Sequence, residues 1–219
     1  MPKKKILKQS SNSLKSILII LSYFISPYLI SFISDSYLFR CIFHILYFVI
    51  LIFAYKNTLM KDIKNIKKDK KKSIKIIASG VLLIFVVTIL VNAVIGLIFN
   101  IKQIPENDYS LMILFNESPL FLMLLTCIYY PIVEGIIFRK TVRDIIDKKW
   151  VFIIFSSLFY FLFNILYTSM SFNTIMASLC YFTTMMILSY SYFKTNIFTF
   201  SVFMIMLYNF IFTILTFLL

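Results

Sequence analysis

The chain has 219 residues, of which 61% are apolar and only 14% are charged, and its mean hydropathy is +0.92. A soluble domain is about 45–50% apolar and about 25% charged, so the composition excludes a water-soluble globule. Three glycines and five prolines exclude collagen-like and low-complexity classes, and the high apolar content excludes disorder. The formal net charge of +13 sits between apolar runs, which favours membrane topology over nucleic-acid binding.

Seven apolar runs have the length of membrane-spanning helices. A helix needs about 20 apolar residues to cross a bilayer, and only helices or closed barrels satisfy the backbone there. The runs cover residues 17–34, 37–55, 76–99, 120–138, 150–167, 173–193 and 197–218. They predict an all-α polytopic membrane protein with about seven spans, in which residues 194–196 alone separate the last two. The first run lacks a small-residue cleavage site, so we expect an uncleaved helix rather than a signal peptide.

Lysine and arginine alternate from loop to loop. They are dense in the N-terminal tail, in residues 56–75, in residues 139–149 and at Lys194, and sparse in the loops between. Because positive loops stay in the cytoplasm, we expect a cytoplasmic N-terminus and an extracellular C-terminus, and the Lys/Ile/Phe/Asn-rich composition hints at a bacterial plasma membrane. The stretch from Lys61 to Lys75 has two interpretations: a solvated loop that sets topology, or a patch attracted to anionic lipid.

The same charge pattern divides the chain into three parts. Residues 1–56 hold the N-terminal tail and two helices, residues 57–75 a basic cytoplasmic loop, and residues 76–219 a helical core.

Ionisable residues at membrane depth are costly and point to function. Arg40 lies near a helix end, where we expect its side chain to reach the interface, and we expect His44 to be a packing residue. Glu134 is the most informative, within the segment PIVEGIIFRK of residues 131–140. Pro131 should kink this helix, and Gly135 should allow a close helix neighbour. A carboxylate this deep acts either as a polar lock between helices or in a reaction or ligand site.

Other polar and sulfur-containing residues carry weaker signals. Asn92, Asn164 and Asn209 fall within predicted helices, where amides tend to bond across helices. The cysteines 41, 127 and 180 lie in separate runs without C-x-x-C spacing, so we expect packed thiols rather than disulfides or a zinc site. Methionines such as Met185 and Met204 are expected to pack in the core.

The order of these motifs resembles the CPBP family, the CAAX-protease and bacteriocin-processing membrane proteins. That family has a Glu-Glu-x-x-x-Arg motif, then Phe-x-x-x-His, then His-x-x-x-Asn, in successive parts of a helical core. Here EGIIFR, from Glu134 to Arg139, resembles the first motif. Tyr160 and Asn164 stand at the positions of the second motif, and Ile205 and Asn209 at those of the third. The resemblance covers residues 115–219.

The departures from the motifs concern the chemistry. In active members the resemblance implies that glutamate and two histidines activate water or hold a metal for peptide cleavage. This chain keeps Glu134, Arg139 and Asn209, but Gly135, Asn164 and Ile205 replace the second glutamate and both histidines. Asparagine and isoleucine cannot relay protons near neutral pH or form a usual zinc site. We therefore expect a pseudoenzyme with no confident catalytic residue, no metal and no cofactor.

Three functions remain open. The first is a non-catalytic scaffold or regulator of a membrane-anchored or cell-wall enzyme, as the lysostaphin-resistance branch of the family suggests by analogy. The second is a divergent intramembrane endopeptidase that uses Glu134, with Asn164 and Asn209 polarising the scissile carbonyl. The third is self-immunity to a bacteriocin. Membrane lipid and a protein partner are the expected partners, and nucleic acid is not. A transporter is disfavoured because no internal repeat is visible.

Overall fold

The structure is a computed structural model that describes residues 2–33, 36–100, 118–166, 168 and 170–218. Every regular element in these residues is a helix. Among them, six stretches are long and apolar enough to cross a membrane: Cys41–Lys68, Lys70–Phe99, Pro119–Ile145, Lys149–Leu166, Phe172–Thr195 and Phe198–Leu215. The predicted class, an all-α polytopic membrane protein, is confirmed.

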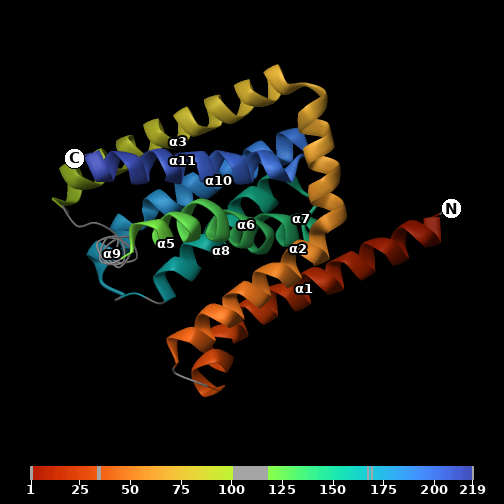
Figure 1. The fold of residues 1–219 in the computed structure, drawn as a ribbon. Helices are drawn as coiled ribbons and strands as arrows, with labels where there is room; N and C mark the ends of the chain where they lie inside the picture. The colour runs from red at the N-terminus through yellow and green to blue at the C-terminus, as the bar shows by residue number, and fades with distance from the viewer. Residues whose placement is uncertain (1, 34–35, 101–117, 167, 169, 219) are drawn as a thin grey trace.

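The elements follow one another as an antiparallel bundle (Figure 1). In chain order they are α1 (Pro2–Ile33), α2 (Tyr37–Lys68), α3 (Lys70–Phe99), α5 (Pro119–Leu124), η1 (Leu125–Tyr129), α6 (Tyr130–Glu134), η2 (Gly135–Lys140), α7 (Thr141–Ile145), α8 (Lys149–Leu166), α9 (Phe172–Ala177), α10 (Leu179–Thr195) and α11 (Phe198–Leu218).

The helix α1 has 32 residues. Within it the stretch Asn12–Ser26 is an apolar helix by composition. The two chain ends lie at opposite ends of the bundle (Figure 1), which is the arrangement that seven crossings would give. The crossing of the membrane by α1, and the side that each terminus faces, stay predictions.

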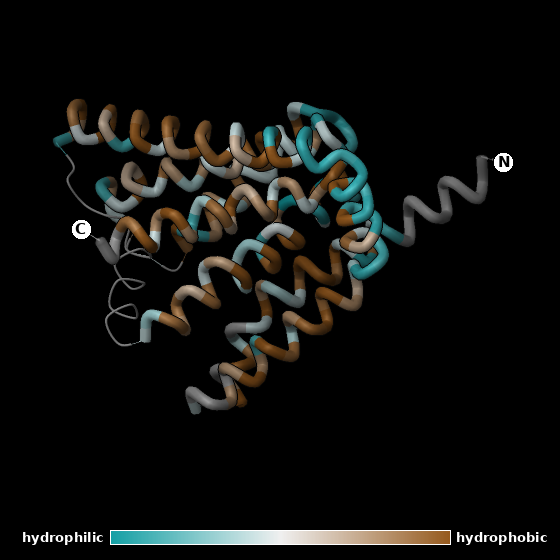
Figure 2. The backbone as a smooth tube through the Cα atoms, turned by 45° about the horizontal axis from the view of Figure 1, so that its top comes forward, coloured by the Kyte–Doolittle hydropathy of each residue, from teal (hydrophilic) through white to brown (hydrophobic). Residues whose placement is uncertain are grey.

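Residues 57–75, expected as a loop, are almost entirely helical. The helix α2 continues to Lys68, and α3 begins at Lys70 after the single residue Asp69. The physical reason is that lysine is a good helix former, and this stretch contains neither glycine nor proline. The charged residues therefore continue the helix beyond the apolar part of α2 instead of ending it. The second half of α2 turns across the end of the bundle (Figure 1), where the tube is hydrophilic in Figure 2.

The helix that carries Glu134 is not a regular α-helix. Two π-helical segments, η1 and η2, interrupt it on either side of the α-helical turn α6. The N–H of Tyr130 donates to the carbonyl of Leu125, and that of Thr141 to Ile136. Pro131 lies just after the first segment and has no N–H to donate, so the wider turn accommodates its ring. Such π-helical turns often occur at functional sites.

Two asparagines end helices in the left-handed conformation. Asn196, with φ of 53°, ends α10 and confirms the expected break between the last two spans. Asn100 ends α3 in the same way. Asparagine tolerates this region because its short side chain can bond locally. The loop between the third and fourth predicted spans, which includes Glu106, Asp108 and Glu117, lies outside the described residues.

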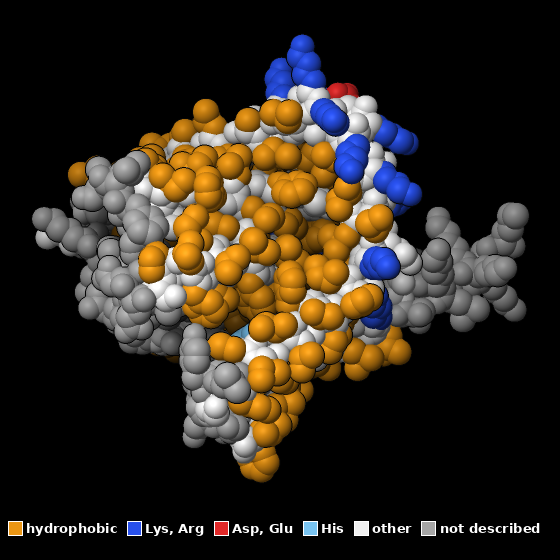
Figure 3. All heavy atoms as spheres, in the orientation of Figure 1, with side chains coloured by type: hydrophobic (Ala, Val, Ile, Leu, Met, Phe, Trp, Pro, Cys, Tyr) orange, Lys and Arg blue, Asp and Glu red, His pale blue; other side chains and the backbone are white. Residues whose placement is uncertain are grey.

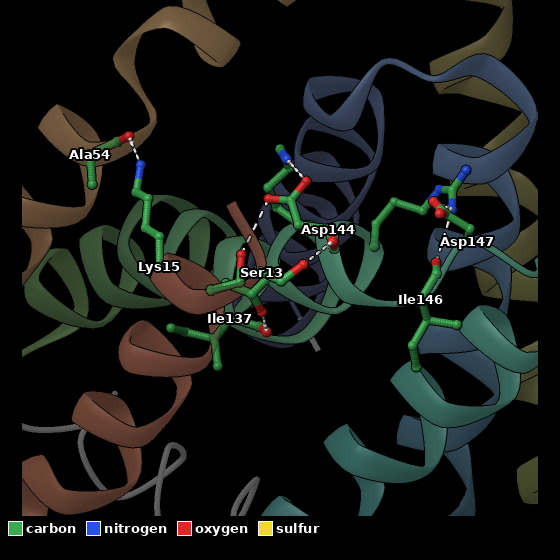
Figure 4. Close-up of polar contacts among 11 residues, drawn as sticks. Ser13, Lys15, Ala54, Ile137, Asp144, Ile146 and Asp147 are labelled. Carbon is green, nitrogen blue, oxygen red and sulfur yellow. Dashed lines mark hydrogen bonds and ion pairs between the residues drawn. The ribbon is translucent and has the colours of Figure 1, made fainter. Parts of the chain in front are cut away.

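Polar contacts at the lysine-rich end attach α1 to α7 (Figure 4). Ser16 donates to Oδ2 of Asp144 over 3.4 Å, and Ser13 donates to the Asp144 backbone carbonyl over 3.3 Å. Lys140 forms an ion pair with the same carboxylate. Lys15 donates to the carbonyl of Ala54 and so also joins α1 to α2. Asp144 thus connects the N-terminal helix with the helix that carries the candidate site.

The core lies where α1, α8, α10 and α11 surround η2. Ile136, Ile137 and Phe138 are fully buried there, together with Phe152 of α8 and Met204 of α11. Phe138 also contacts the ring of Tyr160 edge-on, with ring centroids 5.1 Å apart. The motif-bearing helix is therefore at the centre of the bundle, and its neighbours position the residues described next.

Candidate functional site

A small cavity lies at the junction of α6, η2, α8, α10 and α11. Its volume is about 20 Å³, and its lining residues are Pro131, Glu134, Arg139, Tyr160, Thr184, Met185, Leu188 and Ile205. A water molecule needs roughly 10–15 Å³ measured in this way, so the cavity has room for water but not for a peptide. Pockets for ligands usually measure about 300–1,000 Å³.

Glu134 is held by a tyrosine at this cavity. The hydroxyl of Tyr160 donates to Oε2 of Glu134 over 3.0 Å. Tyr160 lies on α8 at the position where the family motif has phenylalanine, and it is partly buried. The bond occupies one oxygen of the carboxylate that an active member would use as a base.

Arg139 is one of the most enclosed side chains in the described part of the chain, with 1% of its surface exposed. Its Nη1 lies 3.6 Å from the sulfur of Met185, a weak acceptor. Its Nε and Nη2 have no hydrogen-bond partner among the described residues. The guanidinium and the carboxylate of Glu134 line the same cavity, so the two opposite charges share one low-dielectric enclosure without a direct ion pair among the described atoms.

Gly135 makes room for Arg139. A Cβ placed at Gly135 would lie 2.7 Å from Nη2 of Arg139 and 3.1 Å from Cζ of Phe198 on α11. This confirms the expected close helix approach at Gly135. It also gives the second motif position a physical reason for lacking a side chain, because the arginine occupies that space.

The two asparagines of the predicted site do not line the cavity. Asn164 donates from Nδ2 to the backbone carbonyl of Tyr160, one turn earlier in α8, over 2.8 Å. Asn209 donates to the backbone carbonyl of Thr126 over 2.7 Å, across from α11 to η1. Ile205, at the second histidine position, does line it. The structure therefore brings Glu134 and Arg139 together and leaves Asn164 and Asn209 in supporting positions.

His44 lies apart from the cavity. Its Nδ1 is 2.8 Å from the hydroxyl of Tyr129, and the imidazole meets that ring edge-on with centroids 5.7 Å apart. The packing role expected for the only histidine of the chain is thus combined with a hydrogen bond between α2 and η1. The side chain of Arg40 lies outside the described residues.

The donors at the cavity do not suit a transition metal. Zinc takes histidine nitrogen, cysteine sulfur or carboxylate oxygen, and the cavity offers one carboxylate beside a guanidinium, which would repel a cation. No group of three or more histidine, cysteine, aspartate or glutamate side chains lies together in the described ranges.

The comparisons with known proteins agree with the motif order. Residues 116–211 match the family described as type II CAAX prenyl endopeptidase Rce1-like. Over these residues the chain is similar to that family, which is a branch of the CPBP proteins. No curated protein and no solved structure matches the chain. The resemblance inferred from the motifs is therefore confirmed, and it extends over all the elements that line the cavity.

Some residues of the Rce1-like site were not identified from the sequence. Thr184 and Leu188 of α10 line the cavity, but no motif marks them. Met185 was expected to pack, and it does so as a fully buried residue, yet its sulfur also faces the Arg139 guanidinium. The phenolic hydroxyl of Tyr160 was visible as a departure from the family phenylalanine. Its contact with Glu134 needed the relative rotation of α6 and α8, which only the structure gives.

Proposed function

We propose that the chain is a non-catalytic CPBP-family membrane protein, a scaffold or regulator of a membrane-anchored or cell-wall enzyme in a bacterial plasma membrane. The observation that carries the proposal is Ile205, an aliphatic side chain that faces the cavity at a motif histidine position, opposite Glu134. Isoleucine has no group that accepts or returns a proton.

The other contacts at the cavity support a structural use of the motif. Tyr160 bonds Glu134, and Arg139 is enclosed beside it. Glu134 and Arg139 therefore hold neighbouring helices together, as a polar lock does. The cavity that they line is smaller than a peptide bond with its flanking side chains. The retained frame preserves the packing of the bundle, while its outer surfaces are available to a partner.

A divergent endopeptidase is the second candidate. One observation favours it: Glu134 lines a cavity with room for one water, and a lone carboxylate is a weak general base. Its reaction would be hydrolysis of a lipidated or membrane-embedded peptide. For both candidate functions we propose the same orientation, with the lysine-rich end of the bundle in the cytoplasm.

Hydrolysis by the reconstituted chain tests the choice. The full chain and Glu134→Gln, which removes the base but keeps the side-chain shape, would be placed in vesicles with a prenylated CAAX-type peptide and with a lipidated membrane peptide. We expect no cleavage above the Glu134→Gln background for either peptide. Cleavage that Glu134→Gln abolishes would overturn the non-catalytic proposal.

Partner binding is tested separately, by cross-linking the tagged chain in its own cell membranes. The expected result is one protein recovered in stoichiometric amount with both the natural chain and Glu134→Gln. Recovery of no such protein would remove the scaffold role even if hydrolysis is absent.

A further inference from the structure

A basic segment, residues 56–75, lies across one end of the bundle. It consists of the second half of α2 and the first turns of α3, and it carries nine lysines. In Figure 1 this half of α2 runs across the ends of α10 and α11, and in Figure 3 lysine and arginine side chains gather along the same edge. The helices whose ends it crosses belong to stretches that are long and apolar enough to span a membrane. The basic segment is thus oriented along the membrane surface.

The inner face of the basic segment is fixed to the bundle. Leu59 and Ile66 pack against the core, and Asp62 between them is only 4% exposed. Oδ2 of Asp62 accepts hydrogen bonds from the backbone N–H of Thr199 over 3.1 Å and from its hydroxyl over 3.2 Å. A carboxylate at the first turn of α11 is favoured by the helix dipole. These contacts set the rotation of the helix and so determine which side chains point away.

The outer face presents exposed lysines. Lys64 and Lys68 lie one helical turn apart on the side away from Asp62, and the exposed Lys61 lies at the edge of this face, next to Asp62. The one other acid of the segment, Asp69, accepts from the backbone N–H of Lys72 as the N-cap of α3. The ion pairs between described side chains lie within residues 140–147. Within the described residues, Lys64 and Lys68 therefore form no ion pair with an acidic side chain.

Apolar and aromatic side chains mark the level of the membrane interface at this end. Met60 and Ile63 are 50% and 36% exposed on the flank of the lysine face. Trp150 is 60% exposed, and Lys149 lies over its ring at 4.7 Å and over Tyr190 at 4.9 Å. Tryptophan and tyrosine concentrate where headgroups meet acyl chains. A helix with a lysine face and an apolar flank at that level is suited to lie in the interface.

From these observations we propose that the outer face of the basic segment binds the headgroups of anionic phospholipids in the adjacent leaflet. The lysine ammonium groups pair with headgroup phosphates, and Met60 and Ile63 enter the boundary with the acyl chains. An acidic protein segment would meet the same charges. Lipid is favoured because the exposed apolar side chains of Met60 and Ile63 flank the lysines, and a purely acidic partner would leave them uncovered. The proposal does not depend on whether the domain is catalytic.

Quenching of tryptophan fluorescence by brominated lipids tests the proposal in the full chain. Trp150 is the only tryptophan, so Met60→Trp in a Trp150→Phe background places a single probe on the basic segment. The protein is reconstituted in phosphatidylcholine vesicles with a minority of phosphatidylglycerol, and the bromine is carried by one lipid or by the other. We expect stronger quenching by brominated phosphatidylglycerol than its share of the lipid would give.

The lysine face is removed by Lys61→Gln, Lys64→Gln and Lys68→Gln together, and the matched control changes the same three to arginine. Each basic residue near an anionic surface contributes about fivefold to binding, so the glutamine variant should lose up to about a hundredfold of its relative affinity. The arginine variant should keep it. Because all three side chains are exposed, helix content and thermal midpoint should stay unchanged in both.

Two results would overturn the proposal. One is equal quenching by the two lipids in the lysine-containing chain, which would leave an acidic protein as the partner of this face. The other is an unchanged preference after the glutamine substitutions. If a variant fails to reconstitute, the unsubstituted chain is measured at raised salt instead. The preference for phosphatidylglycerol should fall as the Debye length shortens, and a preference that salt does not change would also overturn the proposal.

Discussion

The hydroxyl of Tyr160 and the carboxylate of Glu134 are joined by a hydrogen bond of 3.0 Å between α8 and α6. The family motif has phenylalanine at this position, so the bond is a feature of this chain. It makes Glu134 a polar contact between two helices.

Tyr160→Phe should destabilise the protein, because it leaves an enclosed carboxylate oxygen without its donor. The expected cost is about 1–3 kcal/mol, which corresponds to a fall of about 2–4 °C in thermal midpoint per kcal/mol for a chain of this size. The measurement is thermal unfolding of the detergent-purified chain. The control is the same change in a Glu134→Gln background, where we expect a clearly smaller effect. Equal costs in both backgrounds would show that the two side chains are not coupled.

Arg139→Met should be more damaging than Tyr160→Phe. The guanidinium is the positive charge nearest to Glu134 at the cavity, and removal of one member of a buried charge pair costs about 3–5 kcal/mol. Methionine keeps most of the volume, so the loss reports charge rather than a void. Adding Glu134→Gln should recover part of the lost thermal midpoint. A double variant no more stable than Arg139→Met alone would contradict a charge pairing across the cavity.

Gly135→Ala should also destabilise, because the new methyl group would lie 2.7 Å from Nη2 of Arg139 and 3.1 Å from Cζ of Phe198. Overpacking of this kind costs about 1–3 kcal/mol. In an Arg139→Met background the nearest of these atoms is absent, so the same change should cost less there. Thermal unfolding of the four combinations decides, and additive effects would mean that Arg139 does not occupy the space beside Gly135.

The sequence predicted the parts of this site that lie on one short helix. Glu134, Gly135 and Arg139 belong to a single motif, so their proximity follows from chain connectivity. The rotation of one helix against another is a different matter. Asn164 and Asn209 carry motif positions, yet their amides bond backbone carbonyls beside the cavity, and Thr184 lines it without any motif. Neighbouring apolar faces fix those rotations through packing, which a pattern of hydrophobic residues does not specify in a chain that is apolar almost throughout.

At the connection between α2 and α3, the sequence predicted the position of the chain correctly but its secondary structure wrongly. Charge correctly indicated where the chain leaves the apolar layer, but it was interpreted as an irregular loop, whereas residues 57–68 remain helical. The helix persists because its inner face is held by tertiary contacts, above all those of Asp62. A single aspartate among lysines gives no sequence signal for a bond to Thr199, 137 residues later.

Asp62→Asn should therefore loosen the packing of α2 on the first turn of α11. Both bonds go to one oxygen of Asp62, so the amide oxygen of asparagine can still accept them but carries no charge for the helix N-terminus, and Asp62→Ala removes both bonds. We expect a small loss for asparagine and about 1–3 kcal/mol for alanine. The control is Asp147→Asn, whose carboxylate is exposed and pairs with Arg143 at 3.3 Å, because exposed pairs contribute at most about 1 kcal/mol. A larger loss at Asp147 than at Asp62 would refute the assigned role.

Asn209→Leu tests whether the retained motif asparagine acts as a bond between helices. Its Nδ2 donates to the carbonyl of Thr126 in the π-helical segment η1, where the backbone departs from α-helical pairing. Hydrogen bonds between membrane helices average about 0.6 kcal/mol and reach about 1.7 kcal/mol, so we expect a loss within that range. Asn92→Leu is the matched control, since Asn92 is an exposed amide of α3 and its loss should leave the thermal midpoint unchanged or raise it. If the two substitutions have equal effects, Asn209 supplies no specific link to η1, and its retention would need a role other than packing.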